Sequence, residues 1–107
     1  MNKTKIFSNS ATQHLFDKIK NPNLIQMKRN LIIQKFSDGE IAIEFPDSIR
    51  GYDIFILGDT SKNLTELLFT IDAAKRASVK SITVVLPYYG YGRQDRRGSE
   101  RVNIGAK

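Results

Sequence analysis

The sequence has no cysteine and only one histidine, His14, in its 107 residues. Without cysteine, the protein has no disulfide and no thiolate that could act as a nucleophile or metal ligand. No apolar stretch approaches the roughly 20 residues that a membrane-spanning helix needs, and residues 1–5 lack the apolar core of a signal peptide. A chain of this length forms one domain at most. These absences predict a cytoplasmic protein with a modest core.

Acidic residues are also scarce relative to basic ones. Lysine and arginine number 17 against 11 aspartates and glutamates, which gives a net charge of +6. The excess is concentrated near the carboxyl end, where residues 93–107 carry Arg93, Arg96, Arg97, Arg101 and Lys107. A basic balance favours anionic partners such as nucleotides, sugar phosphates, nucleic acid or anionic membrane. It does not choose among them.

The amino-terminal part of the chain predicts a strand, a helix and a hairpin. Residues 5–8 read as the strand, and a helix capped by Ser10 or Thr12 extends to about Lys20. The inner side of this helix carries Leu15, Phe16 and Ile19. Two further strands, residues 31–36 and 41–45, are joined by a turn that contains an Asp-Gly pair. His14 falls on the predicted helix, and we interpret it as a surface residue.

The middle of the chain predicts a parallel βαβ unit. Residues 53–57 and 81–86 are apolar runs of strand length, and Asn63 with Glu66 has the capping-box pattern of a helix start. Strand, helix and strand with short links form a right-handed unit with parallel pairing. We expect seven positions of this unit to be buried: Phe55, Ile56, Leu67, Leu68, Ile71, Val84 and Val85.

The most informative segment follows the last predicted strand, where residues 87–97 read PYYGYGRQDRR. Ligands of open α/β sheets bind just beyond the carboxyl ends of the strands. Arginine presents a rigid fork of donors that matches phosphate oxygens, and glycine lets the backbone approach a ligand. A flexible basic tail that faces solvent is the alternative. Spacing alone does not separate the two interpretations.

The same segment closely resembles PYFGYARQDRR, a motif of the ribose-phosphate pyrophosphokinases, which make phosphoribosyl pyrophosphate. Three other blocks resemble motifs of this family in the family's order: FSDGE at residues 36–40, IRGYDIFI at 49–56 and the helix at 63–78. The similarity runs from about Ile6 to Lys107. It implies a phosphoribosyltransferase-like α/β fold, an open, twisted and mainly parallel sheet with a β-hairpin. It also makes residues 1–107 a partial, truncated N-terminal domain.

The resemblance assigns part of an ATP site to the hairpin turn, which in the family reaches into a neighbouring subunit. Phe36 would pack against adenine, while Asp38 and Glu40, on either side of Gly39, would serve the base and the ribose. Carboxylates suit an exocyclic amine or a hydroxyl as acceptors, and they do not suit phosphate. Without the family, a hairpin turn with solvated carboxylates is the plainer interpretation.

Five further residues are assigned by the resemblance at the carboxyl end. Arg93 and Gln94 correspond to the family's ATP-contacting pair, with Arg93 on the phosphates. A possible regulatory or phosphate-facing loop contains Arg96, Arg97 and Arg101. The alternative for this loop is a mobile, solvated segment.

The family moves the diphosphoryl group of ATP onto the C1 hydroxyl of ribose 5-phosphate with Mg²⁺. The family segments that bind metal and ribose 5-phosphate match nothing in this chain, so the resemblance implies no catalytic residue and no metal ligand here. We expect the chain to bind ATP or ADP, to lack synthesis on its own, and to form a homo-oligomer or to join a synthetase subunit. A non-catalytic nucleotide-binding or subunit-interaction module, related to synthetase-associated proteins, is the main alternative. Nucleic-acid binding is a weaker one, because it has no motif of its own.

Overall fold

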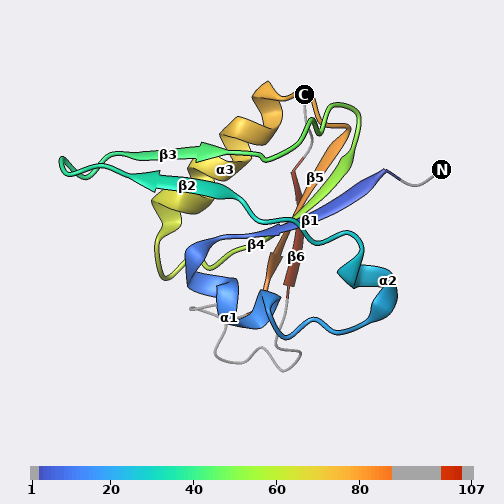
Figure 1. The fold of residues 1–107 in the computed structure, drawn as a ribbon. Helices are drawn as coiled ribbons and strands as arrows, with labels where there is room; N and C mark the ends of the chain where they lie inside the picture. The colour runs from blue at the N-terminus through green and yellow to red at the C-terminus, as the bar shows by residue number, and fades with distance from the viewer. Residues whose placement is uncertain (1–2, 88–99, 105–107) are drawn as a thin grey trace.

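The computed structural model describes residues 3–87 and the backbone of residues 100–104. Its centre is a four-stranded sheet in the order β1–β4–β5–β6 (Figure 1). The first three strands, β1 (Thr4–Ser8), β4 (Asp53–Leu57) and β5 (Ser81–Leu86), are parallel, and β6 (Glu100–Ile104) pairs antiparallel with β5. The predicted neighbouring, parallel arrangement of β4 and β5 is therefore confirmed.

The helix between these strands, α3 (Leu64–Arg76), packs one side against the sheet. The largest core cluster joins Leu67 and Ala74 of this helix to Ile54, Ile56 and Val84 of the sheet. Of the seven residues expected to be buried, Ile56, Leu67 and Val84 are buried, and Phe55, Ile71 and Val85 are partly buried. The prediction for Leu68 is wrong, since its exposed fraction is 53%. A residue one position after Leu67 turns by about a quarter of the helix circumference, which takes it away from the sheet.

The predicted capping box at the start of α3 is also wrong. Asn63 has the left-handed conformation, with φ 54° and ψ 46°, and its side chain makes no capping hydrogen bond. The side-chain carboxylate of Glu66 does not return to the backbone amide of Asn63. It is buried and accepts hydrogen bonds from Ser10, on the segment after β1. A tertiary contact thus takes the place of the local cap.

The first predicted helix is shorter than expected. A 3₁₀ turn, η1 (Ser10–Thr12), leads into a single turn of α-helix, α1 (Gln13–Phe16). The hydroxyl of Thr12 donates to the carbonyl of Leu57 at 2.9 Å, which fixes this segment to the end of β4. Phe16 is buried, Leu15 and Ile19 are partly buried, and His14 is exposed as predicted. A second short helix, α2 (Pro22–Ile25), begins at Pro22, where proline suits the first helical position.

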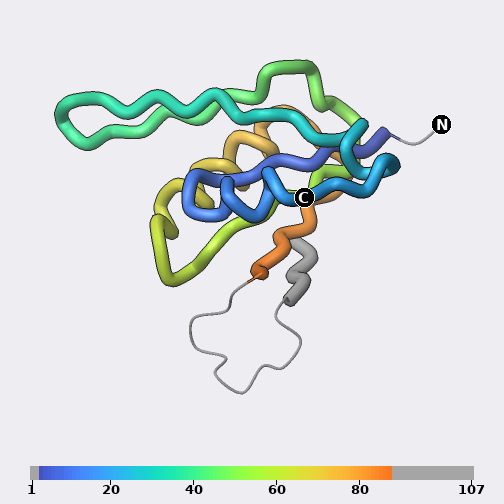
Figure 2. The backbone as a smooth tube through the Cα atoms, turned by 60° about the horizontal axis from the view of Figure 1, so that its bottom comes forward, coloured from blue at the N-terminus to red at the C-terminus, as the bar shows by residue number. Residues whose placement is uncertain are grey.

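The predicted hairpin forms a separate two-stranded antiparallel sheet, β2 (Ile32–Lys35) and β3 (Ile41–Glu44). It extends beside α3 and away from the rest of the molecule (Figures 1 and 2). Ile41, Ile43 and Phe45 are partly buried while Ala42 and Glu44 are exposed, so the predicted alternation is confirmed. Phe45 anchors the base of the hairpin, with its ring edge-to-face against Phe7 at a centroid distance of 4.7 Å. No helix in the described part of the chain is long and apolar enough to cross a membrane.

Candidate functional site

The tip of the hairpin is a tight turn built around Gly39. The amide of Gly39 donates to the carbonyl of Phe36 at 2.9 Å, and the amide of Phe36 donates to the carbonyl of Glu40 at 2.9 Å. Gly39 has φ +92°, a left-handed conformation that glycine adopts without steric cost. This is the three-residue hairpin loop in which glycine follows a type I turn. The predicted turn at Asp38–Gly39 is confirmed.

The side chains at this tip face solvent. Phe36 is 50% exposed, and Asp38 and Glu40 are both exposed. One oxygen of Asp38 accepts the backbone amide of Glu40 at 3.1 Å, which leaves its other oxygen open. In the part of the chain that the structure describes, neither carboxylate forms an ion pair. The tip therefore presents one aromatic face and two anionic acceptors, a set that can stack on a planar ring and accept hydrogen bonds from its polar groups.

The arginine-rich assignments cannot be placed on this structure. Arg93, Gln94, Arg96 and Arg97 lie outside the described residues. Only the backbone of Arg101 is described, in β6, where it pairs with Val85 of β5. The described chain does bring the segment's start, Pro87, to the carboxyl end of β5, where the sequence predicted it.

The carboxyl ends of β1 and β4 meet in a buried polar network that the sequence analysis did not identify. The carboxylate of Glu66 accepts the backbone amide and the hydroxyl of Ser10, and also the side-chain amide of Asn63 at 3.1 Å. Beside it, the amide of Asn9 donates to the hydroxyl of Thr70 at 2.9 Å. Glu66, Thr70 and Asn9 are all at most 1% exposed. The network locks α3 to the loop after β1; its only sequence signal was polar residues on the inner side of a helix.

The loop after β4 contains a second tight polar turn, centred on Asp59. Its carboxylate accepts the backbone amide of Ser61 at 2.8 Å and the hydroxyl of Ser61 at 2.7 Å. Burial acts to raise the pKa of Asp59, but the hydrogen bonds from Ser61, with the backbone amide and charge of Lys62, outweigh it and hold the pKa below its ordinary value. The turn therefore keeps a carboxylate ionised at the edge of the sheet.

The hairpin tip and the carboxyl end of β5 lie on different sides of the molecule. Figure 1 places the tip beyond α3, while β5 ends at the lower edge of the sheet. The rotated view of Figure 2 separates them in the same way.

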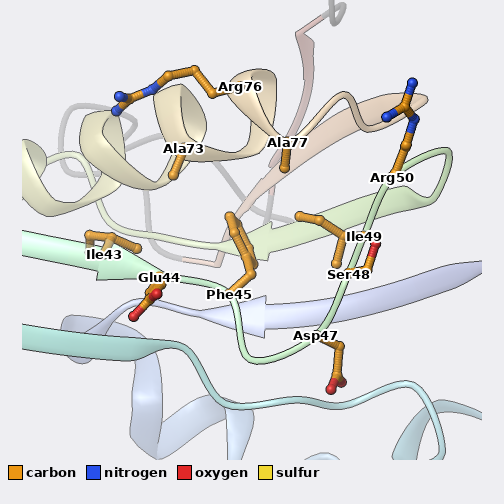
Figure 3. A pocket seen from close by; sticks show the side chains of 10 residues that line it. All are labelled: Ile43, Glu44, Phe45, Asp47, Ser48, Ile49, Arg50, Ala73, Arg76 and Ala77. Carbon is orange, nitrogen blue, oxygen red and sulfur yellow. The ribbon is translucent and has the colours of Figure 1, made fainter.

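A cavity of about 550 Å³ lies between the base of the hairpin and the end of α3. Figure 3 shows Phe45 and Ile49 between the two elements, with the guanidinium groups of Arg50 and Arg76 at opposite ends and pointing apart. No sequence prediction fell on this cavity. Its lining comes from two separated stretches of chain, residues 43–50 and 73–77, which a sequence pattern does not bring together.

These features define an α/β domain with an open, mainly parallel sheet and a projecting β-hairpin. The family described as the N-terminal domain of ribose phosphate pyrophosphokinase matches residues 4–107. The chain therefore belongs to the ribose-phosphate pyrophosphokinase family.

Relatives of this family cover nearly the whole chain. A ribose-phosphate pyrophosphokinase of Porphyromonas gingivalis is 47% identical over 99% of the chain, and one of Thermotoga maritima is 46% identical over 99%. The crystal structure of phosphoribosylpyrophosphate synthetase from Mycobacterium smegmatis matches 90% of the chain with a TM-score of 0.72 and 37% identity. The chain spans about a third of each protein's length, namely 34%, 35% and 33%. The fold and the family expected from the sequence are both confirmed.

Proposed function

We propose that the hairpin tip of this chain is one part of the ATP site of a ribose-phosphate pyrophosphokinase. In the proposed reaction the diphosphoryl group of ATP moves to the C1 hydroxyl of ribose 5-phosphate. The observation that carries the proposal is the half-exposed ring of Phe36 at a hydrogen-bonded turn that also presents the carboxylates of Asp38 and Glu40. Family membership supplies the substrate class.

The chemistry of the tip suits the adenosine end of ATP. Stacking on an aromatic side chain contributes about 1–3 kcal/mol per base. The acceptors of Asp38 and Glu40 complement the exocyclic amine of adenine and the hydroxyls of ribose. Their negative charges would repel the triphosphate, so the phosphates must be held elsewhere. We assign them to Arg93 with Gln94, and we propose Arg96, Arg97 and Arg101 as a phosphate-facing or regulatory loop.

Magnesium would accompany the nucleotide. Among the described residues, no group of three or more histidine, aspartate or glutamate side chains is placed to hold a metal ion. Mg²⁺ binds readily through substrate phosphates and retained waters. We therefore propose that it arrives on ATP, and we assign it no ligand in this chain.

We further propose that the site forms between two copies of the chain or between this chain and a synthetase subunit. The separation of the hairpin tip from the carboxyl end of β5 supports this, because the two lie on different sides of the molecule (Figure 2). The exposed apolar residues of α3 are consistent with self-association, since apolar patches on a surface mark contacts with partners. They are Leu64, Leu68 and Phe69.

The direct test compares nucleotide binding by Phe36→Ala and by a control variant, Ile25→Ala. Ile25 is an apolar residue exposed to a similar extent, 46%, but it lies on α2, outside both the hairpin and the apolar patch of α3. By calorimetry with ATP and Mg²⁺, we expect Phe36→Ala to weaken binding about tenfold or more, as the loss of one base-stacking contact requires. Ile25→Ala should bind as the unmodified chain does. Equal affinity in all three proteins would refute the adenine assignment.

Mixing two variants tests the shared site. Phe36→Ala and Arg93→Ala should each bind nucleotide poorly alone. If a site uses Phe36 of one copy and Arg93 of another, a mixture of the two variants should recover a fraction of intact sites after subunit exchange. Recovery should fall on dilution. A mixture that binds nucleotide no better than its components would contradict the shared site. Either both residues would then come from one copy, or Arg93 would not contribute to the site.

A non-catalytic nucleotide-binding module is the second candidate. Under either candidate we expect the 107-residue chain to bind nucleotide without making phosphoribosyl pyrophosphate by itself, because the match is to the N-terminal domain of the family alone. The informative measurement is synthesis after addition of a full-length synthetase. A gain above that enzyme's own rate, abolished by Phe36→Ala, would favour a catalytic role for the hairpin; binding without any gain would favour the module.

A further inference from the structure

Positive charge also gathers at the amino-terminal ends of β1 and β4, the opposite ends of these strands from the buried polar network. Lys3 and Lys5 lie at the start of β1, and the ammonium groups of both approach the ring of Tyr52, at 5.7 and 5.5 Å from its centroid. Lys3 and Lys5 alternate with Thr4, so both point to the same face of the sheet. Tyr52 directly precedes β4, beside the start of β1, where Thr4 pairs with Asp53 and Lys5 with Ile54.

Neither lysine has an acidic partner in the described part of the chain. The two ion pairs found there are Arg29 with Asp47 and Arg76 with Asp72. The nearest carboxylate along the chain, Asp53, follows Tyr52 and points to the opposite face, where it accepts the hydroxyl of Ser81 at 2.6 Å. Lys80 adds a third basic residue to the same edge, since its amide donates to the carbonyl of Tyr52 at 2.7 Å. The positive charge at this edge is therefore uncompensated.

A cavity of about 460 Å³ opens beside these lysines, between the start of β1 and helix α2. Its lining includes Lys5, Tyr52 and the amide side chains of Asn23 and Gln26. The side chain of Asn23 makes no hydrogen bond to another described residue, and that of Gln26 has only a long contact of 3.4 Å to the carbonyl of Pro22. The lining thus includes ammonium, amide and phenol groups, all of which can donate hydrogen bonds.

We propose that this cavity is a binding site for the phosphate group of a small anion. A dianionic phosphate matches the uncompensated ammonium group of Lys5, which lines the cavity, together with that of Lys3, which contacts the same Tyr52 ring. Lysine binds phosphate as a point charge. Tyr52 contributes by holding both long side chains over its ring through cation–π contacts, so less side-chain freedom is lost when the anion binds. The amides of Asn23 and Gln26 complete the set of donors. The site is separate from the proposed ATP site, because it uses none of its residues.

The experiment is an NMR titration of the 107-residue chain with inorganic phosphate, at an ionic strength held constant with chloride. We expect the side-chain amide signals of Asn23 and Gln26 to shift with the backbone amide signals of Lys5 and Tyr52. Loss of one charge-assisted hydrogen bond should weaken phosphate binding by about tenfold or more in Lys5→Gln. Lys5→Arg keeps the charge and should retain most of the affinity.

The matched control is Lys18→Gln, which removes one exposed lysine from the turn after α1, outside the lining of the cavity, and should leave the affinity unchanged. Parallel titrations with ribose 5-phosphate and ADP show whether the phosphate comes from a free ion, a sugar or a nucleotide; the source that binds tightest identifies the ligand. Signals that shift only elsewhere, or equal affinity in Lys5→Gln and Lys18→Gln, would overturn the site. Both results leave the hairpin proposal untouched.

Discussion

The side-chain amide of Asn9 donates to the hydroxyl of Thr70 at 2.9 Å, across 61 positions of sequence. Both residues are at most 1% exposed, and the carbonyl oxygen of the Asn9 side chain has no protein hydrogen-bond partner. This one bond pairs the buried side-chain nitrogen of Asn9 and ties the end of β1 to the middle of α3. It also makes the helix sensitive to loss of a single hydroxyl.

Thr70→Val should therefore destabilise the protein. The substitution keeps the shape of the side chain but leaves the amide of Asn9 without a partner, and an unsatisfied buried donor costs about 1–3 kcal/mol. Urea denaturation followed by circular dichroism measures the change in the free energy of unfolding. Thr65→Val, at an exposed position of the same helix, is the control and should change it by less than about 0.5 kcal/mol. Equal effects of the two substitutions would show that the Asn9 contact does not matter.

Glu66→Gln should destabilise the protein by about 1.5–3 kcal/mol, the range for hydrogen bonds to a charged group. The carboxylate accepts three donors from Ser10 and Asn63, whereas an amide offers one oxygen and points its own donor at one of them. Asp72→Asn is the matched control, because it breaks an exposed pair with Arg76 worth about 0–1 kcal/mol. Chemical denaturation of both variants measures the two changes in the free energy of unfolding. A smaller loss for Glu66→Gln than for Asp72→Asn would contradict the role of the network.

Asp59 should make stability depend on pH in the acid range. Its pKa is lower in the folded protein than in the unfolded chain, so its contribution is fully present above the unfolded value, near 3.8, and is lost as pH falls through the folded value. The difference in unfolding free energy between the unmodified chain and Asp59→Asn should therefore be constant from pH 7 to about pH 5 and narrow below it. Ser61→Ala removes the hydroxyl donor and should weaken this dependence. If the free energy of unfolding varied with pH in the same way for all three proteins down to pH 2.5, the role of Asp59 would be refuted.

Gly58→Ala should destabilise the protein although glycine there has ordinary backbone geometry. An added Cβ would lie 2.7 Å from Cδ1 of Leu67 and 3.2 Å from Oδ1 of Asn9. Overpacking of this kind typically costs about 1–3 kcal/mol. A double-mutant cycle with Leu67→Ala tests the cause, because the smaller side chain removes the closest contact. Gly58→Ala should cost less in that background, and an unchanged cost would assign the effect to the backbone instead.

The sequence predicted the parts of the fold that depend on local periodicity. The strand at Asp53–Leu57, the helix after Asn63 and the strand at Ser81–Leu86 each carry their own pattern, and short links left parallel pairing as the arrangement. The hairpin turn was predictable for the same reason, since Asp38–Gly39 has a conformational preference of its own. At the candidate site, this preference predicted the backbone of the tip, whereas the assignment of its side chains to an ATP site came only from the resemblance to a family.

The errors arose where distant contacts decided the outcome. Glu66 was predicted to cap its own helix, but its carboxylate accepts hydrogen bonds from Ser10 instead. Leu68 was counted with the buried face, but the sheet contacts the side of α3 that carries Leu67 and Thr70. Strand β6 has no strong pattern of its own, and its pairing with β5 is set by tertiary structure. Neither the cavity at the hairpin base nor the one beside Tyr52 has a sequence signal, because each is lined by separate stretches of chain.

The sequence separation between paired strands of the central sheet has a consequence for the order in which the protein folds. Only α3 separates β4 from β5 in the sequence. In contrast, α1, α2 and the whole hairpin separate β1 from β4, so the pairing of Ile6 with Phe55 closes a longer loop. Closing a longer loop costs more chain entropy, and distant pairings slow folding. The βαβ unit is thus the expected nucleus, with β1 added late. Substitutions in β1 should then speed unfolding, while those in α3 should slow folding.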